Sequence, residues 1–166
     1  HLYPPEPFAE VYEAARALGL RTSAHAGEAA GPESIRGAVE ALKVDRIGHG
    51  IAAHADESVM ALLAETQVPI ELCPLSNVAT GSLAGIEDHP VRQFWDAGLM
   101  LTVNTDDPGM FHNSMVEEFV VLHDVFGFDR AQIKTFILNG VAASWQTAEQ
   151  RAAMATAFQA APAWQS

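Results

Sequence analysis

The chain has 166 residues, of which 49% are hydrophobic and 18% are charged, as is typical of one globular domain that can bury a core. Its formal net charge of -12, with nine scattered Lys and Arg residues, argues against nucleic acid and anionic membrane surfaces as partners and favours a small neutral or cationic ligand. The sequence contains no apolar run long enough to cross a membrane, and its single cysteine, Cys73, excludes an internal disulfide and favours a reducing compartment such as the cytoplasm.

Helices and strands are predicted to alternate over the first two thirds of the chain. Apolar side chains at helical spacing predict a helix over residues 7–18, which Gly19 would end. Because each predicted strand follows a helix through a short connection, the pattern predicts a parallel α/β sheet covered by helices. Two or three more helices are predicted from Val116 onward. The remaining predicted helices are 32–42, 56–65 and 90–98, and the predicted strands are 20–28, 45–50, 68–77 and 99–103.

Polar side chains lie at the carboxyl end of each of the four predicted strands. The carboxyl ends of parallel strands form the active face of α/β folds, so these side chains are expected to meet at one edge of the sheet. Two histidines and three carboxylates in such a place are typical of a metal-assisted hydrolytic site. The residues concerned are His25 and Glu28, then His49, then the segment from Cys73 to Asn77, and finally Asp106 and Asp107.

Several of these residues also have a purely structural interpretation. Asp106 and Asp107 could be turn residues before Pro108, although two adjacent acids repel each other and thereby favour a cation beside them. His25 could be a core histidine, and Glu28 could be a surface acid.

His49 is less easily explained by packing, because it lies between Gly48 and Gly50, and paired glycines indicate close approach to the backbone. The other internal histidines are expected to be exposed to solvent. They are His54, His89, His112 and His123.

Four short segments resemble the successive strand-end motifs of the adenosine deaminase family, in the order that family shows. They are "SAHAGE" at 23–28, "RIGHG" at 46–50, "ELCPLSN" at 71–77 and "VNTDDP" at 103–108. The resemblance extends from about residue 7 to about residue 145, and four ordered motifs are far more specific than one.

The resemblance implies a fold and a set of roles. The family is a (β/α)8 TIM-type barrel with one zinc ion, and residues 1–166 would supply the second half of that single barrel domain, strands five to eight, plus the C-terminal helices. His25 and Asp106 would bind zinc. The remaining implied roles are proton exchange with the purine ring for Glu28, orientation of the zinc-bound water for His49, substrate binding for Asp107, and shaping of the site by Ser76 and Asn77 in a loop.

One part of the family pattern is missing from this sequence. The family's first strand carries a His-x-His pair that completes the zinc shell, and no His-x-His occurs here. Since zinc takes about three or four protein ligands, two further histidines are expected from an N-terminal half of the same barrel. The chain alone is therefore expected to be inactive. It is also expected to expose Ile47, Ile70, Leu72 and Val103 toward an incomplete barrel interior.

The resemblance implies hydrolytic deamination of a 6-aminopurine nucleoside, with adenosine converted to inosine and ammonia. Aminodeoxyfutalosine and adenine remain alternative substrates, while the acidic charge balance argues against a nucleotide monophosphate. Two other classes also stay open. One is a different metal-dependent amidohydrolase, and the other is a non-catalytic barrel that only binds a ligand.

Overall fold

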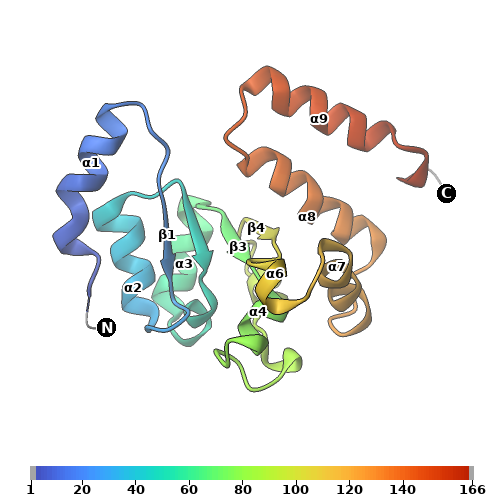
Figure 1. The fold of residues 1–166 in the computed structure, drawn as a ribbon, viewed down its shortest axis with the longest axis horizontal. Coiled ribbons are helices and arrows are strands. Elements are labelled where there is room, and N and C mark those ends of the chain that lie inside the picture. The colour runs from blue at the N-terminus through green and yellow to red at the C-terminus, as the bar shows by residue number, and fades with distance from the viewer. Residues whose placement is uncertain (1–2, 165–166) are drawn as a thin grey trace.

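The computed structural model describes residues 3–164 and contains a four-stranded parallel sheet in the order β1-β2-β3-β4 (Figure 1). The predicted parallel α/β architecture is therefore confirmed. Each strand is shorter than the predicted segment, because only three or four residues of each segment form the strand. The strands are β1 (Ser23–Ala26), β2 (Arg46–His49), β3 (Ile70–Leu72) and β4 (Leu101–Val103).

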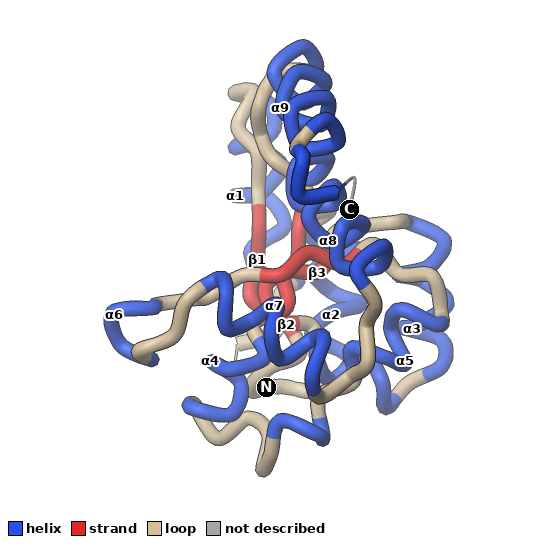
Figure 2. The backbone as a smooth tube through the Cα atoms, turned by 90° about the vertical axis from the view of Figure 1, so that its right-hand side faces the viewer, coloured by secondary structure: helices blue, strands red, loops and turns tan. Residues whose placement is uncertain are grey.

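The helices that connect the strands lie close to their predicted positions. The predicted 32–42 helix changes from α-helical to π-helical geometry at Ala38. Figure 2 shows α2, α3 and α5 together on one side of the strands. These helices are α1 (Ala9–Ala17), α2 (Pro32–Gly37), α3 (Glu57–Thr66) and α5 (Val91–Asp96). A 3₁₀ turn (Glu6–Phe8) precedes α1, and the π-helical segment (Ala38–Leu42) continues α2.

Two short helices follow strands where the sequence indicated a longer strand or a loop. The segment 73–77 was expected to be strand and loop, whereas the structure has a helix from Pro74, where the fixed φ of proline suits the first helical turn. Pro108 likewise begins a short helix after β4. The remaining helices are α4 (Pro74–Ala79), α6 (Pro108–Phe111), α7 (Met115–Asp124), α8 (Arg130–Ala143) and α9 (Ala148–Ala160).

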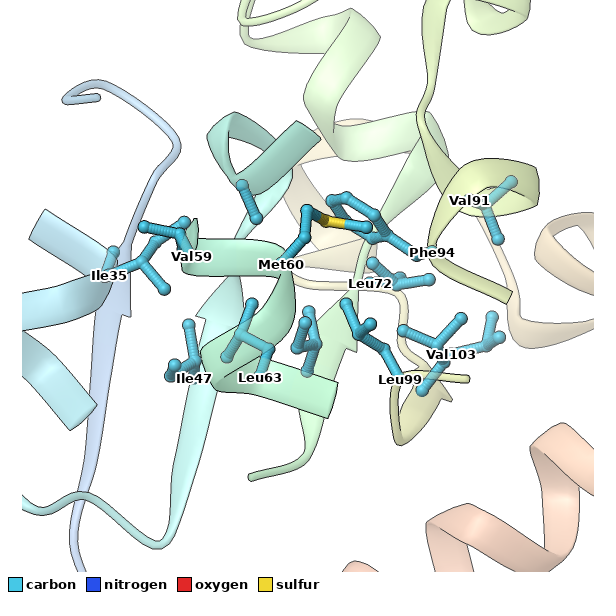
Figure 3. Packing of buried hydrophobic residues seen from close by; sticks show 14 of the residues in the cluster. Ile35, Ile47, Val59, Met60, Leu63, Leu72, Val91, Phe94, Leu99 and Val103 are labelled. Atoms are coloured by element: carbon cyan, nitrogen blue, oxygen red, sulfur yellow. The ribbon is translucent and has the colours of Figure 1, made fainter. Parts of the chain in front are cut away.

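The hydrophobic core lies between the sheet and the helices, as Figure 3 shows for the side chains around α3. Ile47, Ile70, Leu72 and Val103 were expected to face an open barrel interior, and this expectation is wrong: all four are buried in this core. The reason is the alternation of side chains along a strand, which directs these positions toward the helices.

The opposite face of the sheet is polar. His25, Gly48 and Glu71 occupy one row of the register, and a Cβ atom on Gly48 would lie 3.1 Å from the His25 ring. In the neighbouring row Arg46 forms an ion pair with Glu71 at 3.1 Å and stacks on Trp145, which lies between α8 and α9. This face carries the side chains that would line a barrel interior.

None of the helices in residues 3–164 combines the length and the hydropathy that a bilayer crossing requires.

Candidate active site

Three of the predicted side chains meet at the carboxyl edge of the sheet. The ring centroids of His25 and His49 are 5.0 Å apart, and His49 Nε2 lies 3.9 Å from Asp106 Oδ2. All three residues line one cavity of about 280 Å³, which also contacts Glu71 and Cys73. The parallel topology produces this arrangement, because it brings the ends of β1, β2 and β4 to the same edge.

The backbone at this edge is strained at two of these positions. His49 and Asp106 have φ values of 65° and 59°, in the left-handed region that non-glycine residues rarely adopt. Such residues cost about 1–3 kcal/mol each and cluster at functional sites. The left-handed turn at His49 changes the direction of its side chain at the end of β2, so that the ring reaches the polar edge.

Gly27 provides the turn that brings Glu28 to the site. Its φ is 71°, and a Cβ atom there would lie 2.4 Å from a side-chain carbon of Ile35. Glycine is therefore required both by conformation and by space.

The carboxylate of Glu28 is held by several donors. Its Oε1 accepts hydrogen bonds from Asn77 Nδ2 at 3.3 Å, from Thr80 Oγ1 at 3.4 Å and from Ser82 Oγ at 3.3 Å. Its Oε2 lies 3.3 Å from His49 Nε2. Donors from α4 and the turn after it thus fix one oxygen, and the other oxygen faces the histidine.

The contacts of His49 determine its tautomer. Its side chain is buried, and Asn77 Nδ2 lies 3.1 Å from Nδ1. Because the amide nitrogen donates, Nδ1 is the acceptor and the proton of the neutral ring is on Nε2, facing Glu28. Burial lowers the pKa of His49, the His25 charge lowers it further, and the carboxylates of Glu28 and Asp106 partly offset this effect.

The two adjacent aspartates have different contacts. Asp106 Oδ2 accepts a hydrogen bond from the buried Ser76 Oγ at 2.6 Å. Asp107 instead caps α6, since its Oδ1 accepts from the backbone N–H of Met110 at 2.9 Å. The structure therefore brings His25, Glu28, His49, Ser76, Asn77 and Asp106 together through direct contacts, whereas Asp107 contacts the backbone of α6.

The donor types at this edge suit zinc, because imidazole and carboxylate are its usual ligands together with thiolate. Burial, reinforced by the charge of Asp106, raises the pKa of the Cys73 thiol in this cavity to about 12. Within residues 3–164 no group of three or more His, Cys, Asp or Glu side chains is placed to hold a metal ion. His25 and Asp106 offer an imidazole and a carboxylate at the cavity.

The prediction for the other histidines holds at three positions. His54, His112 and His123 are exposed, but His89 is only 3% exposed. His89 Nδ1 accepts the backbone N–H of Val91 at 3.1 Å at the start of α5, and burial lowers the pKa of its ring to about 4. The expectation for His89 is wrong because its ring packs edge-on against Phe126, with the centroids 6.2 Å apart.

Sequence reasoning gave no role to Thr80, Ser82 or Glu118, although the first two contact Glu28 directly. Hydroxyl residues in a turn carry no spacing signal, and their contacts join segments about fifty residues apart along the chain.

The family profile described as adenosine deaminase matches residues 2–161 of this chain. An adenosine deaminase of Clostridium acetobutylicum is 39% identical over 147 residues, which are 89% of this chain and 44% of that protein. An adenosine deaminase of Escherichia coli strain SE11 is 39% identical over 152 residues, 92% of this chain and 46% of that protein. The chain thus spans about half the length of the curated relatives it matches.

Solved structures show the same relation. The adenine deaminase from Arthrobacter aurescens superposes with a TM-score of 0.89 at 34% identity, covering 94% of this chain and 48% of that one. An amidohydrolase from Burkholderia ambifaria with bound Zn superposes with a TM-score of 0.87 at 32% identity, covering 98% of this chain and 45% of that one. The fold is therefore that of the deaminase and amidohydrolase TIM barrels, of which this chain matches about half.

Proposed function

Because this chain belongs to the adenosine deaminase family, we propose that it supplies the carboxyl-terminal half of the barrel in a zinc-dependent purine deaminase. Residues 1–166 would form one half of a single barrel domain, and a complementary half would complete the site. The observation that carries the proposal is the meeting of His25, Glu28, His49 and Asp106 at one edge of the parallel sheet.

His25 and Asp106 are the residues proposed to hold zinc, with two further histidines from the complementary half. A bound zinc ion would lower the pKa of a water molecule toward about 7 and so supply the attacking hydroxide. The bound Zn of the similar Burkholderia amidohydrolase supports the choice of zinc as the metal. Ser76 fixes one carboxylate oxygen of Asp106 and thereby limits the orientations that the ligand can adopt.

His49 is proposed to orient the attacking water. Its Nε2–H faces the carboxylates of Glu28 and Asp106, so it can donate a hydrogen bond to an oxygen placed among them. The same N–H would stabilise negative charge as that oxygen attacks the ring carbon. Asn77 keeps the ring in this tautomer through the contact at Nδ1.

Glu28 is proposed as the proton donor to the purine. Addition of hydroxide to the C–NH₂ carbon places charge on the neighbouring ring nitrogen, which Glu28 would protonate. The carbon–nitrogen bond then breaks, the amino group leaves as ammonia after taking the proton of the added hydroxyl, and the ring retains the oxygen as a carbonyl. Asp107 is proposed to bind another ring nitrogen and so to place the substrate.

Adenosine is the substrate we propose first. The two curated relatives named above, at 39% identity, are adenosine deaminases, and the acidic charge of this chain disfavours a phosphorylated substrate. The similarity to the Arthrobacter adenine deaminase makes adenine the second candidate, ahead of aminodeoxyfutalosine. A reducing compartment such as the cytoplasm suits a protein with the unpaired thiol of Cys73.

The test is to measure ammonia release by the intact protein from adenosine, adenine and aminodeoxyfutalosine, together with its zinc content. We expect one zinc per active site and the highest kcat/KM with adenosine. Faster turnover of adenine would overturn the substrate assignment. Two metals per site would favour a different amidohydrolase, and a protein with neither zinc nor turnover would favour a binding module.

A further inference from the structure

Glu118 is a fully buried acid that lies outside the group of residues assigned above. It is in α7, and its two carboxylate oxygens each accept one hydrogen bond. Oε2 accepts from the backbone N–H of Leu75 at 3.3 Å, and Oε1 accepts from Asn113 Nδ2 at 2.7 Å. Burying a carboxyl group against neutral donors is costly, and burial here raises the pKa of Glu118.

Both donors lie next to the candidate site. Leu75 is in the first turn of α4 and precedes Ser76. Asn113 Nδ2 also donates to the backbone carbonyl of Thr105 at 2.9 Å, and Thr105 precedes Asp106. Since Ser76 itself donates to Asp106, the contacts form a closed ring that we call the Glu118 ring: Glu118, Leu75, Ser76, Asp106, Thr105 and Asn113.

We infer that Glu118 is a positioning residue, which fixes the spacing between α4 and the Thr105–Asp106 segment and so presents the Asp106 carboxylate in one orientation to the metal. This inference rests on the proposed function, because Asp106 is a zinc ligand only under that proposal.

Two features of the segments explain why an external support is needed. Asp106 has a left-handed backbone with a φ of 59°, which persists only when the surroundings hold it. The other segment, α4, has six residues, too few for a helix to be stable by itself. The carboxylate of Glu118 satisfies one of the free N–H groups at the start of α4, where negative charge is also favoured.

The ring requires two acceptor atoms on residue 118. In a Glu118→Gln variant the side chain keeps its shape but has one acceptor oxygen, so its NH₂ group must face either the Leu75 N–H or the Asn113 NH₂ group. One of the two contacts is therefore lost. Asn113→Ala removes the connection to Thr105 from the other side. Leu122→Ala is the matched control, because Leu122 is one turn further along α7 and equally buried but is not part of the ring.

The experiment compares these variants in the intact enzyme by competition for zinc with a chromogenic chelator and by thermal unfolding of the metal-free protein. We expect Glu118→Gln and Asn113→Ala each to weaken zinc binding by about tenfold or more, as is usual when the residues that orient a metal ligand are changed. The double variant should be no weaker than the worse single variant, since both act through the same ring. Leu122→Ala should lower the unfolding temperature but leave zinc affinity within about twofold.

Wild-type zinc affinity in Glu118→Gln and Asn113→Ala would overturn the inference while leaving the proposed function intact. Equal loss of zinc affinity in Leu122→Ala would also overturn it, because the effect would then be one of stability alone. A wild-type protein that binds no zinc and deaminates no purine would overturn the proposed function, and the inference with it. Asn113→Ala provides the answer if Glu118→Gln does not fold.

Discussion

Asp106 and Asp107 are adjacent in the sequence but make different contacts. The left-handed backbone of Asp106 directs its carboxylate to Ser76 and the cavity, whereas Asp107 caps α6. Asp adopts this strained backbone conformation more often than most non-glycine residues, so the residue type is compatible with the arrangement but does not predict it. A strand ending in two acids could therefore be identified from the sequence, but which acid faces the cavity could not.

The proposed role of Asp107 can be separated from its role as a helix cap. In Asp107→Asn the amide oxygen can still accept from the Met110 N–H, because Asn is as good an N-cap as Asp. The charge that would bind the purine is lost, so we expect kcat/KM for adenosine to fall about tenfold or more, mostly through KM. Steady-state kinetics checks this, with the unfolding temperature as control. Unchanged kinetics would leave Asp107 with the capping role alone.

Glu28→Gln tests the proposed proton donor. The amide oxygen can keep the hydrogen bonds from Asn77, Thr80 and Ser82, but the side chain can no longer exchange a proton. We expect turnover to fall by about 10²–10⁴-fold while the zinc content stays unchanged. Metal analysis and kcat are measured on the same sample. Substantial turnover in this variant would show that another group protonates the ring.

His89 predicts a pH dependence of stability. Its pKa is lowered from 6.5 to about 4 by burial in the folded state, so between these values the unfolded chain binds more protons than the folded one. The contribution of neutral His89 to the free energy of unfolding is therefore fully present above the unfolded pKa of 6.5, and it is lost as the pH falls from there toward 4. We expect a loss of about 2 kcal/mol between about pH 7 and about pH 5.

Urea unfolding of the wild type and of His89→Asn at both pH values measures this contribution. The Asn oxygen occupies the position of Nδ1 and can still accept the N–H of Val91, but Asn does not titrate. The variant should therefore show a smaller decrease, and the difference between the two proteins excludes the contributions of other titrating groups. An equal decrease in both proteins would show that His89 is not responsible.

At the scale of elements, the helices were more predictable than the strands. The helix expected to begin near Asp56 does so, because Asp56 accepts the N–H groups of Ser58 and Val59 and caps α3. The strand expected over 68–77 ends at Leu72, since Pro74 starts α4. Proline at the first helical position predicts the start of a helix such as α4. The apolar run before Pro74, however, resembles part of a longer strand and hides where β3 ends.

The core contribution of α3 can be tested with two substitutions on the same helix. Leu63 is fully buried against the sheet, whereas Glu65 is exposed. Leu63→Ala should lower the free energy of unfolding by about 2–5 kcal/mol, because it leaves a cavity under the helix. Glu65→Ala should change it by less than about 0.5 kcal/mol. Denaturant unfolding of both variants checks this, and similar values for the two would contradict the observed orientation of α3.

At the scale of the whole molecule, the strand ends could be predicted to meet because parallel topology alone requires it. The contacts that hold those residues in place could not be predicted. Glu28 is held by Thr80 and Ser82, and Asp106 by the Glu118 ring, through contacts between segments far apart in the sequence. Such contacts depend on how the segments after β3 and β4 pack against each other. The local pattern "MVEEF" gives no sign that its second glutamate is buried.

The exposed apolar surface also lies elsewhere than the sequence suggested. Among the exposed large apolar side chains, two lie on helices near the outer strands of the sheet. Val11 is 66% exposed on α1, near β1, and Val116 is 71% exposed on α7, beyond β4 (Figure 1). In the described sheet β1 and β4 each pair on one side only, so both ends also present unpaired strand edges.

We therefore expect the 166-residue chain, when prepared without a complementary half, to associate with itself as its concentration rises. Apolar patches beside open strand edges favour such contacts. Replacing Val11 and Val116 together by Lys should reduce the association without destabilising the fold, since neither side chain belongs to the core. Size-exclusion chromatography with light scattering measures the mass of both forms over a range of concentrations. If the unmodified chain stayed monomeric throughout, the two exposed ends would not drive its association.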